Sequence, residues 1–229
     1  MILKIYNTLL EEYSYQGWWP VTPSGSCQGK LEPIYGLRAR TDKQKLEIIF
    51  GAILTQNTSW KNVEKAIINL NEKNLINIDK ILEIEHEKLA KTIKSAGYFN
   101  QKAKKLKNVS KFLKKYPISK LEKTDLDNAR QLLLNVNGIG PETADSILLY
   151  ALNKPIFVVD AYTKRIFTNL GLVKSEDTYE DIQKLFMDHL PSDAKLFNEY
   201  HALIVQHAKK ACNKKPKCDL CSLKKICKN

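Results

Sequence analysis

The chain has 229 residues, 43% of them hydrophobic, which is enough for one large core or two small ones and excludes an intrinsically disordered protein. Its formal net charge of +12 favours a polyanionic partner such as DNA, RNA or an anionic membrane, although a lysine-rich solvated surface has the same composition. No apolar run approaches the roughly 20 residues that span a membrane, and the first residues lack the pattern of a signal peptide. We therefore expect a cytoplasmic protein without a membrane segment.

Apolar residues recur at helical spacing along almost the whole chain. The expected helices cover residues 3–13, 45–54, a segment that starts at residue 60, and 79–82, 86–93, 102–115, 126–136, 141–153, 161–170, 179–190 and 193–211. No stretch shows the sustained period-two pattern of a strand. The sequence thus predicts an all-α fold of many short helices joined by short loops.

The Pro-, Gly- and Ser-rich connection at 17–40 carries Trp18, Trp19 and Cys27. Adjacent tryptophans cannot face the same side of a helix or strand, so we expect one of them in the core. The other is a candidate to line a pocket, although two purely structural tryptophans are an equally good interpretation. Cys27 stands apart from the other cysteines and is expected to be a free thiol.

The helix expected at 102–115 carries many lysines and no acidic residue. Its lysines are Lys102, Lys104, Lys105, Lys107, Lys111, Lys114 and Lys115. A solvated helix face is the ordinary explanation, but a run of one sign is less usual than a mixed face. The run therefore also fits a surface that binds phosphates.

The turn Gly138-Ile139-Gly140 opens a helix at Pro141, and an apolar segment at 155–159 leads to Asp160. Backbone N–H groups at such a turn and helix start suit a phosphate. A glycine turn alone is a weak signal, and an aspartate before a helix is more often an N-cap than a catalytic group. Together, a phosphate-binding turn and a partly buried carboxylate indicate chemistry on a nucleic acid.

Four of the five cysteines lie close together near the end of the sequence. Cys212, Cys218, Cys221 and Cys227 follow the pattern C-x5-C-x2-C-x5-C. In a reducing cytosol such a group of cysteines favours a metal site over disulfide bonds. Four thiolates at this spacing suit either zinc or an iron–sulfur cluster.

These motifs, taken in order, resemble the endonuclease III (HhH-GPD) superfamily of DNA glycosylases over about residues 18 to 228. The matching segments are 51–58 (GAILTQNT), 134–145 (LNVNGIGPETAD) and 158–162 (VVDAY), together with the four cysteines. The resemblance implies an all-α, two-lobed fold. One lobe would be a six-helix barrel at 41–149 with a helix-hairpin-helix near 126–153, and the other would join 1–40 to 150–229 and carry the cysteine cluster at 212–227.

The resemblance also implies roles for individual residues. Asp160 matches the family's essential aspartate, and Gln56 matches the side chain that fills the gap left by a flipped nucleotide. Asn57 and Thr58 would contact the opposite strand. The hairpin residues expected to bind DNA are Gly138, Ile139, Gly140, Glu142 and Thr143. The family's C-terminal cofactor favours a [4Fe–4S] cluster over zinc, although the first cysteine spacing here is one residue shorter than the family's usual one.

Glu142 is the most informative departure from the family. Bifunctional members carry a lysine two positions after the second hairpin glycine, and its amine attacks C1′ and forms a Schiff base. Glu142 occupies that position, and a carboxylate cannot form an imine. The resemblance therefore implies a monofunctional enzyme that removes a base and leaves an abasic site.

The motifs look most like the 3-methyladenine DNA glycosylases of the endonuclease III type. An alkylated purine is cationic, so an aromatic pocket would attract it once it is flipped from the stack. The candidate pocket residues are Trp18, Trp19, Leu46 and Tyr98. The alternatives are a glycosylase for uracil or thymine mispaired with G or for another lesion, a bifunctional glycosylase/lyase, and a non-catalytic DNA-binding protein. The expected partner is damaged double-stranded DNA, bound by a cytoplasmic, nucleoid-associated monomer.

Overall fold

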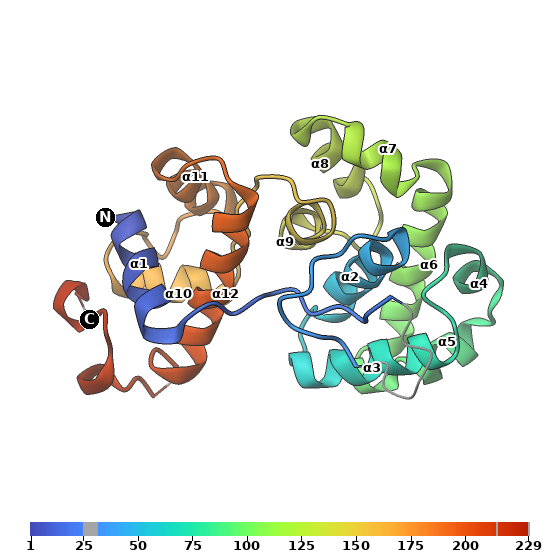
Figure 1. Cartoon of the computed structure of the whole chain (residues 1–229), viewed down its shortest axis with the longest axis horizontal. Helices are drawn as coiled ribbons and strands as arrows, with labels where there is room; N and C mark the ends of the chain where they lie inside the picture. The colour runs from blue at the N-terminus through green and yellow to red at the C-terminus, as the bar shows by residue number, and fades with distance from the viewer. Residues whose placement is uncertain (25–31, 214, 229) are drawn as a thin grey trace. The chain divides into compact units, whose positions relative to one another are not determined.

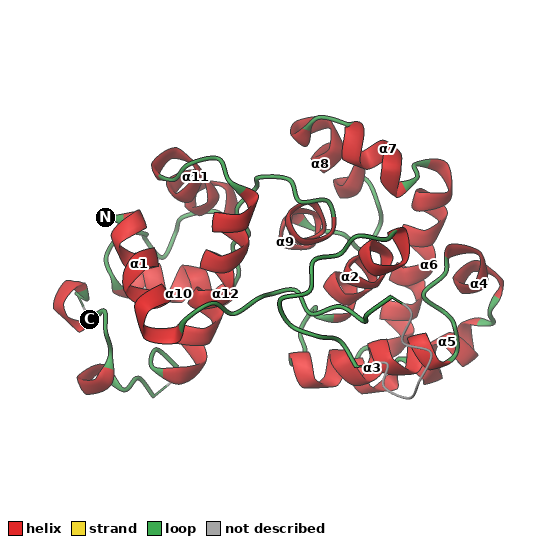
Figure 2. Ribbon diagram, viewed as in Figure 1, coloured by secondary structure: helices red, strands yellow, loops and turns green. Residues whose placement is uncertain are grey.

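The computed structural model describes residues 1–24, 32–213 and 215–228, and Cys27 lies outside the described residues. Helices joined by loops make up the described chain, and the only strand-like pairing in it is an isolated antiparallel bridge between Val21 and Ile34 (Figure 2). The all-α fold expected from the sequence is confirmed. No helix among the described residues is long and apolar enough to cross a membrane.

The chain divides into two compact units (Figure 1). The terminal unit joins Met1–Trp18 to Lys154–Asn229, and the central unit is Trp19–Asn153. The segment after Trp18 therefore belongs with the middle of the chain and not, as the sequence suggested, with the two ends.

Buried hydrogen bonds explain why that segment joins the central unit. The Thr22 N–H donates to Glu47 Oε1 at 2.7 Å, and Asn71 Nδ2 donates to Glu47 Oε2 at 2.6 Å. Burial raises the pKa of the Glu47 carboxyl despite these donors. Because such a carboxyl is costly to bury without partners, it fixes the segment onto the helix that follows.

The central unit contains ten helical segments among its described residues. They are α2 (Asp42–Leu54), α3 (Trp60–Glu72), α4 (Ile78–Glu83), α5 (His86–Thr92), η1 (Lys94–Ala96), α6 (Phe99–Lys115), α7 (Ile118–Lys123), α8 (Leu126–Leu134), α9 (Pro141–Ser146) and η2 (Ile147–Ala151). Helix α2 is buried along most of its length, with Ile49, Phe50 and Ile53 inaccessible to solvent. Helix α6 packs on α2, α4 and α5, so these helices share one core.

The largest differences from the expected helices concern α2, α6, α7 and the helix after the glycine turn. Helix α2 begins at Asp42 because Thr41 and Gln44 form a capping box, in which each side chain accepts from the other residue's backbone N–H. Helix α6 begins at Phe99, directly after Tyr98, whose φ of 44° is left-handed. The helix expected at 141–153 becomes a π-helical turn from residue 147 onward, and α7 was not expected at all.

The terminal unit contains six helical segments among its described residues. They are α1 (Ile2–Tyr13), α10 (Ala161–Asn169), α11 (Tyr179–His189), α12 (Ala194–Lys210), η3 (Cys218–Leu220) and η4 (Lys224–Ile226). Aromatic rings form its core: Phe157 stacks on Phe186, and both approach Tyr200 edge-on. The buried Tyr200 hydroxyl donates to Ile2 O at 2.8 Å, which attaches α1 to α12.

Candidate functional site

The glycine turn joins α8 to α9 in the central unit. Asp125 caps α8 by accepting from the Asn128 N–H at 3.0 Å, and the Ile139 N–H donates back to Val136 O at 3.0 Å. Gly138 has a φ of +100°, which side chains rarely adopt, and a Cβ there would lie 2.5 Å from Lys105 Cγ. The turn therefore requires glycine both for its backbone conformation and for the close approach of a lysine from α6.

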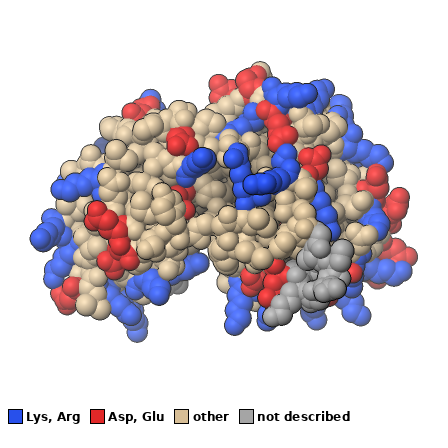
Figure 3. Space-filling model, in the orientation of Figure 1, with Lys and Arg blue, Asp and Glu red and all other residues tan. Residues whose placement is uncertain are grey.

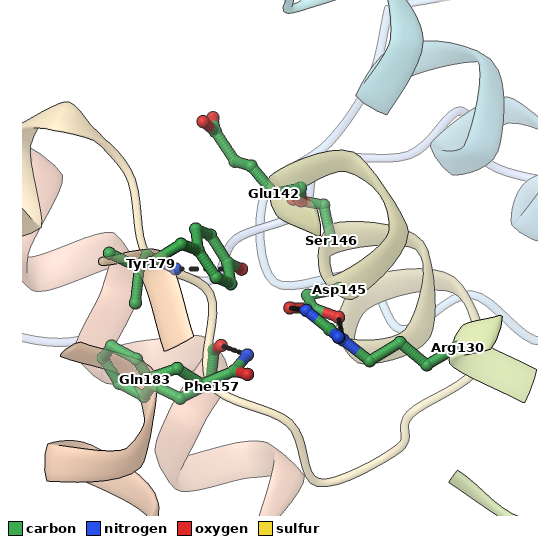
Figure 4. Close-up of polar contacts among 8 residues, drawn as sticks. Arg130, Glu142, Asp145, Ser146, Phe157, Tyr179 and Gln183 are labelled. Carbon is green, nitrogen blue, oxygen red and sulfur yellow. Dashed lines mark hydrogen bonds and ion pairs between the residues drawn. The ribbon is translucent and has the colours of Figure 1, made fainter. Parts of the chain in front are cut away.

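A buried ion pair fastens the two hairpin helices together (Figure 4). Arg130 of α8 donates from Nε to Asp145 Oδ1 at 2.7 Å and from Nη2 to Asp145 Oδ2 at 3.2 Å. The Asp145 side chain is inaccessible to solvent, so the bidentate pair also satisfies a charge that would be costly to bury alone. In Figure 4 the Glu142 side chain extends away from this pair.

Gln56 lies just after the end of α2, and its side-chain amide is bonded on every side. Its Nε2 donates to Gly138 O at 3.1 Å and to Thr143 Oγ1 at 2.9 Å. Its Oε1 accepts from Lys105 Nζ at 2.5 Å. The structure thus brings together three residues that the sequence singled out, and it adds Lys105. The next residue, Asn57, is exposed with a left-handed φ of 53°, and Thr58 is half-buried.

The basic helix is less uniform than its sequence suggests. Lys102 is only 2% exposed, and its Nζ donates to Leu54 O at 2.8 Å and Ala96 O at 2.7 Å. Burial lowers the pKa of this amine to about 8. Lys107 likewise donates inward, to Leu82 O and Ile84 O. The expectation that Lys102 belongs to a charged outer face is wrong.

Lysine and arginine side chains also occur well beyond α6. Figure 3 shows them on the visible face of both units, with acidic side chains among them. The net charge of +12 is therefore not concentrated in one helix.

The candidate pocket residues have very different exposures. The Trp19 indole is 7% exposed, packs where a Gly51 Cβ would be, and has Trp60 and Tyr150 rings at 5.4 Å. Leu46 is also buried, whereas Tyr98 is 65% exposed. Trp19 is therefore the packed member of the tryptophan pair, as one of the two was expected to be.

Trp18 is half-buried and belongs to the terminal unit. The residues before it are held by Glu199, which accepts from the Gln16 N–H at 2.5 Å and the Gly17 N–H at 3.4 Å. Burial raises the pKa of the Glu199 carboxyl. The pocket role of all four residues stays a prediction.

Asp160 is the N-cap of α10 in the terminal unit. Its Oδ1 accepts from the Thr163 N–H at 2.7 Å and from the Thr163 hydroxyl at 2.9 Å. Its Oδ2 lies 3.6 Å from His201 Nε2 on α12. Burial raises the pKa of the Asp160 carboxyl, but His201 and Thr163 outweigh burial, so the pKa lies below the usual value. The group is therefore an ionised carboxylate at neutral pH, with one oxygen held by the helix and the other facing an imidazole.

Helix α11 fixes the extended segment that leads to Asp160 (Figure 4). Gln183 Nε2 donates to Phe157 O at 2.6 Å, and the Val159 N–H donates to the Tyr179 hydroxyl at 3.4 Å. Phe157, Val158 and Val159 are buried. The carboxylate thus follows a rigid support and does not sit on a free loop.

The four C-terminal cysteines lie in the terminal unit as free thiols. Asn169 contacts two of them, with its Nδ2 3.5 Å from Cys212 Sγ and its carbonyl 3.5 Å from Cys227 Sγ. Cys221 Sγ lies 3.6 Å from His207 Nε2. Burial raises the pKa of the Cys221 thiol, and the other three cysteines add to the rise.

Among residues 1–24, 32–213 and 215–228, no group of three or more His, Cys, Asp or Glu side chains is arranged to hold a metal ion. The donor set nevertheless fits an iron–sulfur cluster, because it consists of four unpaired thiols gathered in a short segment.

Comparisons with known proteins agree on one family. The model described as HhH-GPD superfamily base excision DNA repair protein matches residues 50–192. The chain is 47% identical to "Putative DNA repair glycosylase MJ1434" of Methanocaldococcus jannaschii over 99% of this chain and 96% of that protein.

Solved structures of this fold are similar as well, and they include the following two. The H. pylori 3-methyladenine DNA glycosylase MagIII, bound to 1,N6-ethenoadenine, is 30% identical with a TM-score of 0.70, over 91% of this chain and 96% of that chain. A non-covalent endonuclease III–DNA complex has a TM-score of 0.76 at 18% identity, over 99% of this chain and 94% of that chain, and therefore supports the fold alone.

Proposed function

Because this chain belongs to the HhH-GPD superfamily of base excision DNA repair proteins, we propose that it removes alkylated purines such as 3-methyladenine from duplex DNA and leaves an abasic site. The resemblance noted from the sequence and the expected fold are confirmed, and the chain is a DNA glycosylase of this family. The substrate, the monofunctional chemistry and the residue roles are our proposal. The observation that carries it is that the chain keeps an ionised carboxylate at Asp160 but has a carboxylate, Glu142, at the position where strand cleavage would need an amine.

Asp160 performs the chemical step in this proposal. Departure of the base leaves positive charge on the deoxyribose ring, which a nearby carboxylate stabilises. The same group orients or deprotonates the water that attacks C1′. The Thr163 bonds leave Oδ2 as the oxygen that is not committed to capping α10.

Glu142 limits the reaction to hydrolysis. A carboxylate cannot attack C1′ to form a Schiff base, so no covalent intermediate forms at this position. At the hairpin, the nearby amine of Lys105 is occupied by the Gln56 amide. Base removal without strand cleavage is therefore expected.

An alkylated purine suits this single carboxylate, because a cationic base is already a good leaving group. A stacking pocket would attract the cation through aromatic faces, and Trp18, Trp19, Leu46 and Tyr98 remain the residues proposed for it. MagIII, at 30% identity, is a 3-methyladenine DNA glycosylase that was solved with a modified adenine. This likeness supports a purine substrate over uracil or mispaired thymine.

The four cysteines, Cys212, Cys218, Cys221 and Cys227, would hold a [4Fe–4S] cluster. Such a cluster would act as a structural staple for the lysine-rich C-terminal segment, which would then contact phosphates. We further propose that the protein acts as a monomer on damaged double-stranded DNA, in the cytoplasm and associated with the nucleoid. Its charge of +12 supports the DNA partner.

The test is a base-release assay on defined DNA. Methylated duplex DNA is incubated with the protein in parallel with duplexes that contain uracil, a G·T mispair or thymine glycol, and strand breaks are scored before and after hot alkali. We expect release of methylated purines, with strand breaks only after alkali. Release of uracil without methylated purine would assign the second substrate class. Prompt cleavage with an adduct trapped by borohydride would overturn the monofunctional reaction.

A further inference from the structure

Lys105 occupies a position that neither its sequence context nor the proposed reaction explains. It lies nearly two turns from the start of α6 and is half-buried, while its neighbour Lys104 is exposed. Its aliphatic stem lies over Gly138, where a Cβ would meet its Cγ, Cδ and Cε at 2.5, 3.0 and 3.2 Å. Its ammonium reaches Gln56 Oε1. One side chain therefore contacts both the glycine turn and the loop after α2.

The contacts around Gln56 form a closed set. The two amide hydrogens are donated to Gly138 O and Thr143 Oγ1, and the amide oxygen accepts from Lys105. A glutamine normally loses considerable side-chain freedom when it is fixed in this way. Here three groups from α6, the turn and α9 share that restraint. The Lys105 bond is the charge-assisted one and hence the strongest of the three.

We propose that Lys105 is a positioning residue that holds the Gln56 side chain against the hairpin, so that the gap-filling amide and the turn meet DNA as one prearranged surface. This proposal rests on the proposed function, in which Gln56 enters the gap left by a flipped nucleotide. Prearrangement helps because the entropy of ordering the glutamine is then spent on folding and not on binding.

A simple phosphate contact is the competing role for a lysine on this helix. Such a lysine would contribute to all duplexes alike, through release of counterions, and its neighbours would behave in the same way. A positioning lysine instead contributes only when Gln56 has a gap to fill. The two roles therefore differ in which DNA they affect and in whether the effect depends on Gln56.

The experiment measures binding without requiring base release. The full chain is titrated with a duplex that contains a tetrahydrofuran abasic-site analogue and with the same duplex without a lesion. The recorded ratio is the Kd for the lesion-free duplex divided by the Kd for the abasic-analogue duplex, so a high ratio means preference for the abasic analogue. Lys105→Met keeps the stem over Gly138 and removes the ammonium. Lys104→Met removes an exposed charge from the adjacent position and is the matched control. Lys105→Arg keeps charge and donors, and thermal unfolding checks that each variant is folded.

We expect Lys105→Met to lower the ratio about tenfold, as loss of one charge-assisted hydrogen bond predicts. Lys104→Met should weaken both duplexes equally and leave the ratio unchanged. In a Gln56→Ala background, Lys105→Met should lower the ratio no further. Lys105→Arg should retain most of the wild-type ratio.

Several results would overturn the proposal. A Lys105→Met variant that behaves like Lys104→Met would make the residue a phosphate contact, and full additivity with Gln56→Ala would separate the two side chains. A ratio that rises would show that Lys105 restrains Gln56 from entering DNA. A wild-type ratio near one would remove the gap-filling role itself. None of these outcomes depends on which base is excised, so failure of the substrate assignment is recognised separately.

Discussion

The Gln56 site in the central unit and the Asp160 site in the terminal unit are held in different ways. Around Gln56, neutral amide, carbonyl and hydroxyl groups join one lysine, and the amide has all its hydrogen-bonding groups engaged. Asp160 has one oxygen fixed by Thr163 and the other facing the imidazole of His201. The first arrangement suits a surface that must keep its shape over a range of pH. The second suits a group whose charge matters.

The largest expected effect separates charge from shape at Asp160. Asn is also a good N-cap and can accept from Thr163, so Asp160→Asn should keep α10 and DNA affinity. Loss of the negative charge should lower single-turnover base release roughly 10²- to 10⁴-fold, the range for a general acid–base group. Equal turnover in the variant would mean that another group acts at C1′.

Replacement of Arg130 in the hairpin should lower stability, whereas Asp160→Asn should lower base release and leave the helix intact. Arg130→Met leaves the solvent-inaccessible Asp145 without its bidentate partner. A cost of about 3 kcal/mol in unfolding free energy is expected, measured by urea titration. DNA binding and base release should then fall together as the hairpin loosens. A variant with wild-type stability would show that other groups carry the Asp145 charge.

A smaller effect is expected from Gly138→Ala. A side chain at φ +100° is strained, and its Cβ would displace the Lys105 stem. The expected loss of stability is about 1–2 kcal/mol. Affinity for duplex DNA should fall as well, because the turn and the Gln56 contacts move. Gly140→Ala is the control for the stability measurement, since its Cβ would meet nothing within 4 Å.

The smallest expected effect is a shift in pH dependence in His201→Gln. His201 and Thr163 hold the pKa of Asp160 below its usual value, so removal of the imidazole should raise that pKa. The acidic limb of the pH profile for base release should move to higher pH, while the rate above that limb changes little. An unshifted limb would exclude His201 as a partner of the carboxylate.

The same lowered pKa has a consequence for stability. Because Asp160 loses its proton more readily in the folded chain than in the unfolded one, it contributes stability at pH values above about 4. That contribution disappears as the pH falls through the folded pKa. The stability curve of His201→Gln should therefore flatten in this acidic window.

The sequence predicted the local features well because their causes are local. Helix periodicity, the cap at Asp160 and the glycine turn each depend on residues within one or two turns of helix. The position of Lys102 could also have been predicted, since it precedes Leu106 by one helical turn and thus lies on the apolar stripe. We did not predict its burial because a lysine is normally expected on the solvent-exposed face of a helix.

The missed partners are distant in the sequence. His201 meets Asp160, and Lys105 meets Gln56, only because packing brings separate helices together. Neither pairing has a spacing that one sequence can reveal. The π-helical turn at Ile147–Ala151 was also missed, because the apolar run 147–152 is equally compatible with an ordinary α-helix.

The buried Lys102 links folding of the chain to release of a proton, which the buffer takes up. Its pKa is about 8 in the folded state and 10.5 in an ordinary lysine. At a pH between these values the amine is mostly neutral when folded and mostly protonated when unfolded, so folding releases a proton. A neutral amine still has hydrogens to donate, so its hydrogen bonds to Leu54 O at the end of α2 and to Ala96 O at the end of η1 are kept. Calorimetric unfolding near pH 9 should therefore yield different enthalpies in two buffers with different heats of ionisation.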